Sequence, residues 1–121
     1  MDKEILKKRT KALSIEIAHL VQSLPYNIIN KNYSNQIIRC SSSVGANYRA
    51  ACRAKSKADF INKLKIVEEE LDESMFFLEL LLEFNPDFKL TIIKSWKEAN
   101  ELLSIIVSSI TTLRKVIESQ S

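Results

Sequence analysis

Basic side chains dominate the first half of the chain, and their spacing suggests an interaction with a charged partner. Residues 1–54 hold nine Lys and Arg against three Asp and Glu, whereas residues 55–85 hold four against eight. Such a distribution is typical either of a nucleic-acid-binding surface or of charge pairing between neighbouring helices or subunits. The basic residues of the candidate nucleic-acid surface are Lys7, Lys8, Arg9, Lys11, Arg49 and Arg53.

Residues that could perform catalysis or bind a metal are few and poorly placed for either task. His19 lies between two positions of an apolar stripe and has no nucleophile pattern beside it. Cys40 and Cys52 would lie about 18 Å apart along one helix, beyond disulfide reach, and are expected to be buried small side chains. The acidic run at residues 68–73 lacks metal-ligand spacing, and no glycine-rich loop is present. We therefore expect no enzyme, no metal and no cofactor.

An arginine of the second predicted helix is expected to form a structural ion pair with the third. The turn at residues 55–56 is so short that the two helices should fold back on each other directly. In this register Arg39 meets Asp72 and Glu73, where a bidentate contact becomes available. Arg49 and Arg53 have no obvious partner in the hairpin. They remain available for another subunit or for phosphate, or they form a solvated face.

The segment from Ser41 to Asn47 is rich in small side chains that do not favour a helix interior. Gly45 alone costs about 1 kcal/mol relative to alanine. Small residues offset such a cost where another backbone comes close. We therefore expect Ser42, Gly45 and Ala46 to mark close packing against a helix or a subunit, with the approach of a ligand as the alternative.

Four apolar stripes with helical spacing predict the elements that position these residues. The stripes are Leu6, Leu13, Ile17, Leu20 and Leu24; Ile37, Cys40, Val44, Tyr48 and Ala51; Phe60, Leu64, Val67, Leu71, Met75 and Leu78; and Ile92, Trp96, Ala99, Leu103, Ile106, Ile110, Leu113 and Ile117. Each follows the steps of three and four residues that an amphipathic helix requires. With short connections, they predict an all-α, antiparallel up-down four-helix bundle, a single domain over residues 1–121.

The breaks between the stripes predict the helix boundaries. Asn27–Asn32 is expected to be a polar linker in which Ile28 and Ile29 pack against the bundle. The second helix should then cover Tyr33–Ala54. At Asn85–Pro86, the asparagine is expected to cap the fourth helix and the proline to occupy its first position.

The end of the third predicted helix indicates self-association. Residues 75–84 are apolar on nearly every side and are interrupted only by Glu79 and Glu83. A helix that is apolar all round must be buried all round, so a second copy of the chain is expected to cover it. No run of about 18 uncharged apolar residues exists, so we expect no membrane span. The N-terminus lacks the pattern of a signal peptide, and a cytoplasmic location is expected by default.

Three segments carry a resemblance to a known family: Ile37–Asn47, Ser56–Phe60 and Leu64–Val67. The chain resembles the four-helix-bundle family encoded in intervening sequences of bacterial large-subunit ribosomal RNA. That family is similar to the accessory variability protein of diversity-generating retroelements. The resemblance covers nearly the whole chain and implies a homopentamer without enzymatic activity, with nucleic-acid binding through a basic surface. Ala50 and Glu68–Glu70 depart from the family, where glutamate and small residues, respectively, are common.

Two functions follow from these observations. The first is a homo-oligomeric structural or interaction module, expected to be a pentamer, that docks a protein partner. The alternative is an accessory protein that binds RNA or DNA through its basic surface.

Overall fold

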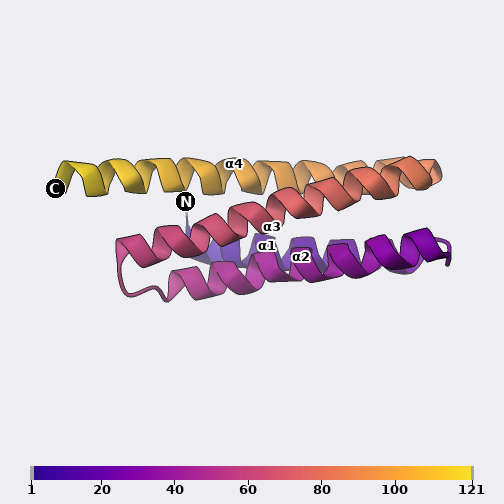
Figure 1. Ribbon diagram of the computed structural model, residues 1–121, viewed down its shortest axis with the longest axis horizontal. Coiled ribbons are helices and arrows are strands. Elements are labelled where there is room, and N and C mark those ends of the chain that lie inside the picture. The colour runs from indigo at the N-terminus through magenta and orange to yellow at the C-terminus, as the bar shows by residue number, and fades with distance from the viewer. Residues whose placement is uncertain (1, 121) are drawn as a thin grey trace.

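The computed structural model describes residues 2–120 and contains four α-helices and one short 3-10 helix (Figure 1). They are α1 (Lys3–Ser23), α2 (Ile28–Cys52), α3 (Lys57–Phe84), η1 (Pro86–Phe88) and α4 (Lys89–Gln120). Successive α-helices run antiparallel, and no strand occurs in the described residues (Figure 1). These features confirm the predicted all-α four-helix bundle. Within the same residues, no helix combines the length and the apolar character that crossing a membrane would require.

Each helix buries its apolar stripe in one continuous core. The predicted core residues that are buried are Leu6, Leu13, Ile17, Leu20, Leu24, Ile37, Cys40, Val44, Tyr48, Ala51, Leu64, Val67, Leu71, Met75, Leu78, Ile92, Ala99, Ile106 and Ile110. The predicted core residues that are only partly buried are Phe60, Trp96, Leu103, Leu113 and Ile117. Next to Leu103, Leu102 is the buried residue. The C-terminal end of α4 projects beyond the other helices (Figure 1), which explains the partial burial of Leu113 and Ile117.

The start of α2 differs from the sequence prediction. Asn27–Asn32 is not a linker, because the Asn27 side chain accepts a hydrogen bond from the Asn30 backbone N–H at 2.8 Å and caps the helix. The helix therefore begins at Ile28. The expectation that the two isoleucines pack against the bundle is also wrong, since Ile28 is 71% exposed and Ile29 is 37% exposed.

A reciprocal amide pair fastens the α1–α2 turn to the α3–α4 break. Asn30 donates to the Asn85 side-chain oxygen at 2.9 Å, and Asn85 donates back at 2.8 Å. Asn30 also donates to the Pro25 carbonyl and Asn85 to the Leu81 carbonyl, both at 2.8 Å. Both side chains are buried. The prediction that Asn85 caps the fourth helix is therefore wrong, because its amide is engaged in this pair, and Pro86 begins η1 instead of α4.

Replacing Asn30 with alanine is expected to lower the free energy of unfolding by about 1–3 kcal/mol, because buried polar groups of Asn85 and Pro25 lose their partner. Urea denaturation followed by circular dichroism measures the change. Asn32→Ala is the matched control, since Asn32 lies in the same helix but is exposed. The control should stay within about 0.5 kcal/mol of the parent. Equal stability of the two variants would contradict a structural role for the amide pair.

Candidate functional site

Basic residues of α1 and α2 meet across a groove with a volume of about 500 Å³. We call it the basic groove. Its lining consists of Glu4, Lys7, Lys8, Lys11, Ser14, Ser42, Gly45, Ala46 and Arg49. Four of the six cations predicted to bind nucleic acid thus share one site with the three small residues predicted to mark close packing. The sequence suggested the two groups separately and gave no reason to combine them.

The small residues of the groove do not all have the same surroundings. A Cβ added to Gly45 would lie 3.5 Å from Thr10 Oγ1 and 3.6 Å from the Lys11 backbone nitrogen, so α1 and α2 approach closely here. Within one chain, close packing therefore applies to Gly45. It does not apply to Ser42 and Ala46, which are exposed.

Arg9 does not belong to the groove, which corrects the sequence prediction. Its guanidinium forms a bidentate contact with Glu98 of α4, with Nε donating at 3.0 Å and Nη2 at 2.7 Å. Glu101 lies 3.2 Å from the same Nη2. The hydrogen bond to Glu98 raises the pKa of Arg9. Arg9 is therefore paired with α4 and lines no part of the groove.

Arg53 is also absent from the groove lining. It is the C-cap residue of α2, and its side chain is exposed. Arg49 lies one helical turn earlier and does line the groove. Arg49 and Arg53, which the sequence analysis grouped together, therefore differ in position: Arg49 lies within α2 and lines the groove, whereas Arg53 lies at the end of α2 outside it.

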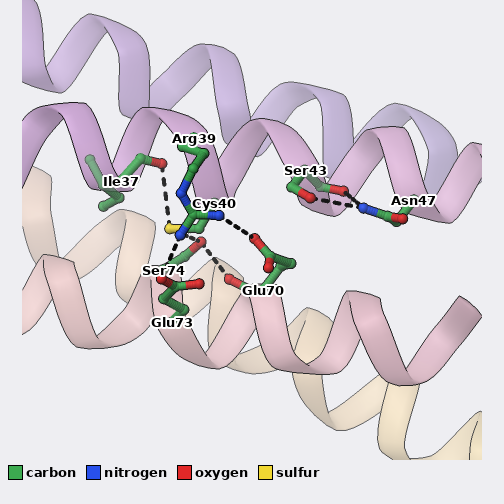
Figure 2. A network of polar contacts seen from close by, with 8 residues as sticks. All are labelled: Ile37, Arg39, Cys40, Ser43, Asn47, Glu70, Glu73 and Ser74. Carbon is green, nitrogen blue, oxygen red and sulfur yellow. Dashed lines mark hydrogen bonds and ion pairs between the residues drawn. The ribbon is translucent and has the colours of Figure 1, made fainter.

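Arg39 of α2 reaches two carboxylates of α3 at the contact between these helices (Figure 2). Its Nη2 lies 2.5 Å from Glu73 and its Nη1 lies 3.5 Å from Glu70. The predicted contact with Asp72 is replaced by the one with Glu70. Glu70 and Glu73 lie one turn apart on the same face of α3, whereas Asp72 is exposed. Because 53% of the Arg39 side chain is exposed, such a pair stabilises a single chain by only about 0–1 kcal/mol.

The Cys40 thiol is buried beside this ion pair, next to Ser74 (Figure 2). The Ser74 hydroxyl donates to the Glu70 carbonyl at 2.7 Å and lies 3.3 Å from Cys40 Sγ. Burial raises the pKa of the Cys40 thiol. A buried, protonated thiol is a poor nucleophile. Cys40 is therefore a packing residue, as the sequence predicted.

The pH dependence of stability tests the surroundings of Glu70. Burial raises the pKa of its carboxyl above its ordinary value, and the charge of Glu73 adds to this effect. Since the folded state holds the proton more tightly than the unfolded state, stability is expected to fall as pH rises from the ordinary glutamate pKa through the raised pKa. Glu70→Gln should remove this part of the pH dependence. Urea denaturation between pH 4 and 7 would measure it.

Asp72→Asn is the matched control, because Asp72 is an exposed acid two residues further along α3. It should keep the pH dependence of the parent chain. If stability depended on pH in the same way in Glu70→Gln, Asp72→Asn and the parent, burial of Glu70 would have no effect on stability.

Comparison with known proteins identifies the family. The sequence profile of the 23S rRNA-intervening sequence protein family matches residues 2–108. The chain is also similar to a crystal structure from Bacteroides thetaiotaomicron, a protein with unknown function from the S23 ribosomal protein family. The TM-score is 0.78 at 30% identity, covering 92% of this chain and 99% of that chain. No curated protein matches. The chain thus belongs to the 23S rRNA-intervening sequence protein family, the family suggested by its second-helix residues.

Proposed function

We propose that this chain is a non-enzymatic interaction module that works as a homo-oligomer and docks a protein partner. The observation that carries the proposal is a group of aromatic side chains on α2 and α3, which we call the aromatic patch: Tyr33, Phe76, Phe77 and Phe84. The Tyr33 ring lies 6.2 Å from Phe77 and 6.0 Å from Phe84, and Phe76 lies 5.4 Å from Phe77. Phe76 is 54% exposed and Phe84 is 50% exposed.

Exposed aromatic rings of this size favour a subunit interface. Contiguous apolar surface on a single chain commonly marks a site of protein association. Aromatic residues are also enriched at interface cores, where they supply large contact areas. Tyr26, Ile28 and Leu90 are each more than two-thirds exposed. Tyr26 and Ile28 belong to the α1–α2 turn, and Leu90 follows the α3–α4 break at which Phe84 ends α3. The turn and the break lie at the same end of the bundle (Figure 1), so this end carries further exposed apolar side chains.

The residues with reactive side chains are better explained by structural roles than by catalysis. Cys40 is buried and protonated, and Arg39 is paired with glutamates. His19 is exposed on α1. These surroundings support a binding role. We propose five copies, because the family resemblance implies a pentamer. The ribosomal RNA in the family's name supports a cytoplasmic place of action.

The parent chain is expected to show a mass several times 13.9 kDa in light scattering at micromolar concentration. A variant carrying Phe76→Ser and Phe84→Ser should shift toward the mass of one chain, because the interface loses two aromatic anchors of the kind that each contribute about 2 kcal/mol or more. Its helical content, measured by circular dichroism, should remain.

The matched control for assembly is Ile15→Ser. Ile15 is an apolar residue of α1 that is 49% exposed and lies outside the aromatic patch. This variant should keep the mass of the parent. A parent chain that is monomeric, or a double variant that assembles like the parent, would overturn the proposal.

The second candidate function is that of an accessory protein that binds RNA or DNA. The specific observation in its favour is the convergence of Lys7, Lys8, Lys11 and Arg49 in the basic groove. Cations on neighbouring helices can contact successive phosphates of one strand. The family's name links it to ribosomal RNA, which agrees with this function.

Arg49→Glu is expected to weaken binding of single-stranded RNA about fivefold or more at 0.1 M salt, because one phosphate contact is lost and a negative charge is added. Arg53→Glu makes the same change of charge one turn away, outside the groove, and should weaken binding less. Gel mobility shift at low salt measures both variants. If the parent chain produced no shift at low salt, this second function would fail.

A further inference from the structure

We propose that the basic groove binds the sugar-phosphate backbone of an extended single strand of nucleic acid, with the bases turned away from the protein. The inference rests on the second candidate function and assigns it a site and a mode of contact. It needs no neighbouring copy, because all the lining residues come from α1 and α2 of one chain.

The cations of the groove are available to an incoming anion. Within residues 2–120, Lys8, Lys11 and Arg49 form no ion pair. Lys7 pairs with Glu4 at 3.1 Å, but the Glu4 side chain is 73% exposed. Exposed pairs of neighbours on one helix are weak and readily exchanged. Four cations can therefore turn to a ligand at little cost.

The small residues leave room for a backbone to enter between these cations. The small residues of α2 have side chains too short to fill that part of the groove: Ser42 ends at Oγ, Ala46 ends at Cβ, and Gly45 has none. Ser42 also supplies a hydroxyl, a group that commonly contacts phosphate oxygens. Under this proposal, the alternative suggested by the sequence, the approach of a ligand, accounts for the small size of Ser42 and Ala46.

The chemistry of the lining favours a phosphodiester over a protein partner. No aromatic or large aliphatic residue lines the groove. Interface cores between proteins depend on such anchors, whereas contacts to phosphate depend on Lys, Arg and hydroxyl groups. The missing aromatic rings also exclude base stacking as a source of affinity at this site. Recognition of the backbone alone is independent of sequence.

The cations of the groove set the expected number of contacts. Lys7, Lys8, Lys11 and Arg49 can each neutralise about one phosphate, along a lining that extends about 10 Å from Lys7 to Ser14 of α1. With three or four phosphates neutralised, the logarithm of the association constant should fall with the logarithm of salt concentration with a slope of about −2 to −3. Raising salt from 50 to 200 mM should then weaken binding about 20- to 50-fold.

Fluorescence anisotropy with labelled 12-nucleotide oligo-U, oligo-dT and mixed-sequence single strands tests the proposal on the full chain. Ala46→Glu places a carboxylate in the groove and should weaken all three about fivefold or more at 0.1 M salt. Ala12→Glu is the matched control, since Ala12 is also exposed on a helix but lines no part of the groove. It should bind within about twofold of the parent, since it removes no phosphate contact. Melting curves should show that both variants fold.

Lys11→Ala provides a second readout that does not depend on Ala46→Glu folding. It should reduce the salt slope by about 0.7 and weaken every sequence equally. If Ala46→Glu and Lys11→Ala bound nucleic acid as tightly as the parent, the groove would not be the binding site. The second candidate function would still stand. Absence of binding by the parent would overturn both. The single-strand assignment would be overturned if a 12-base-pair duplex bound more tightly than the single strands. It would also be overturned if polyglutamate competed as well as an unlabelled single strand.

Discussion

Burial of one apolar stripe from each helix in a shared core is the constraint on which the rest of the structure depends. A helix that turns one arc to the core must present its remaining residues to solvent or to a neighbouring helix. On α1, Leu6 and Leu13 fix this rotation, and Lys7 and Lys11 consequently lie beside α2. The position of the basic groove is therefore a consequence of core packing, because the buried apolar residues orient α1 without any contribution from charged residues.

The polar contacts have different consequences for stability because they differ in burial. Asn30 and Asn85 are buried and satisfy each other, so each depends on the other to avoid an unpaired polar group. Arg39 is more than half exposed, and water can replace its partners. Arg9 is intermediate, since about a quarter of its side chain is exposed beside Glu98. The amide pair therefore specifies the geometry of one end of the bundle, whereas the exposed ion pair adds little to a single chain.

The helices and their buried faces were predictable because hydrophobic spacing records them directly. All five predicted stripe residues of α2 are buried. Boundaries were less predictable, because Asn27 is compatible with both a linker and a helix cap, and only the backbone distinguishes them. Partners between helices were the least predictable. Arg39 was assigned to the correct part of α3, but the choice of Glu70 over Asp72 depends on a rotation that spacing alone does not fix.

The two candidate functions are compatible because their surfaces lie toward opposite ends of the bundle. Nine residues of α2, about 14 Å, separate Tyr33 of the aromatic patch from Ser42 of the basic groove. An assembly that covers the patch can therefore leave the groove open in every copy. Under the two proposals, three or four phosphate contacts would give weak binding at one groove, and several grooves in one assembly would act on the same strand at high effective concentration. Self-association would then supply the affinity that a backbone-only site of this length lacks.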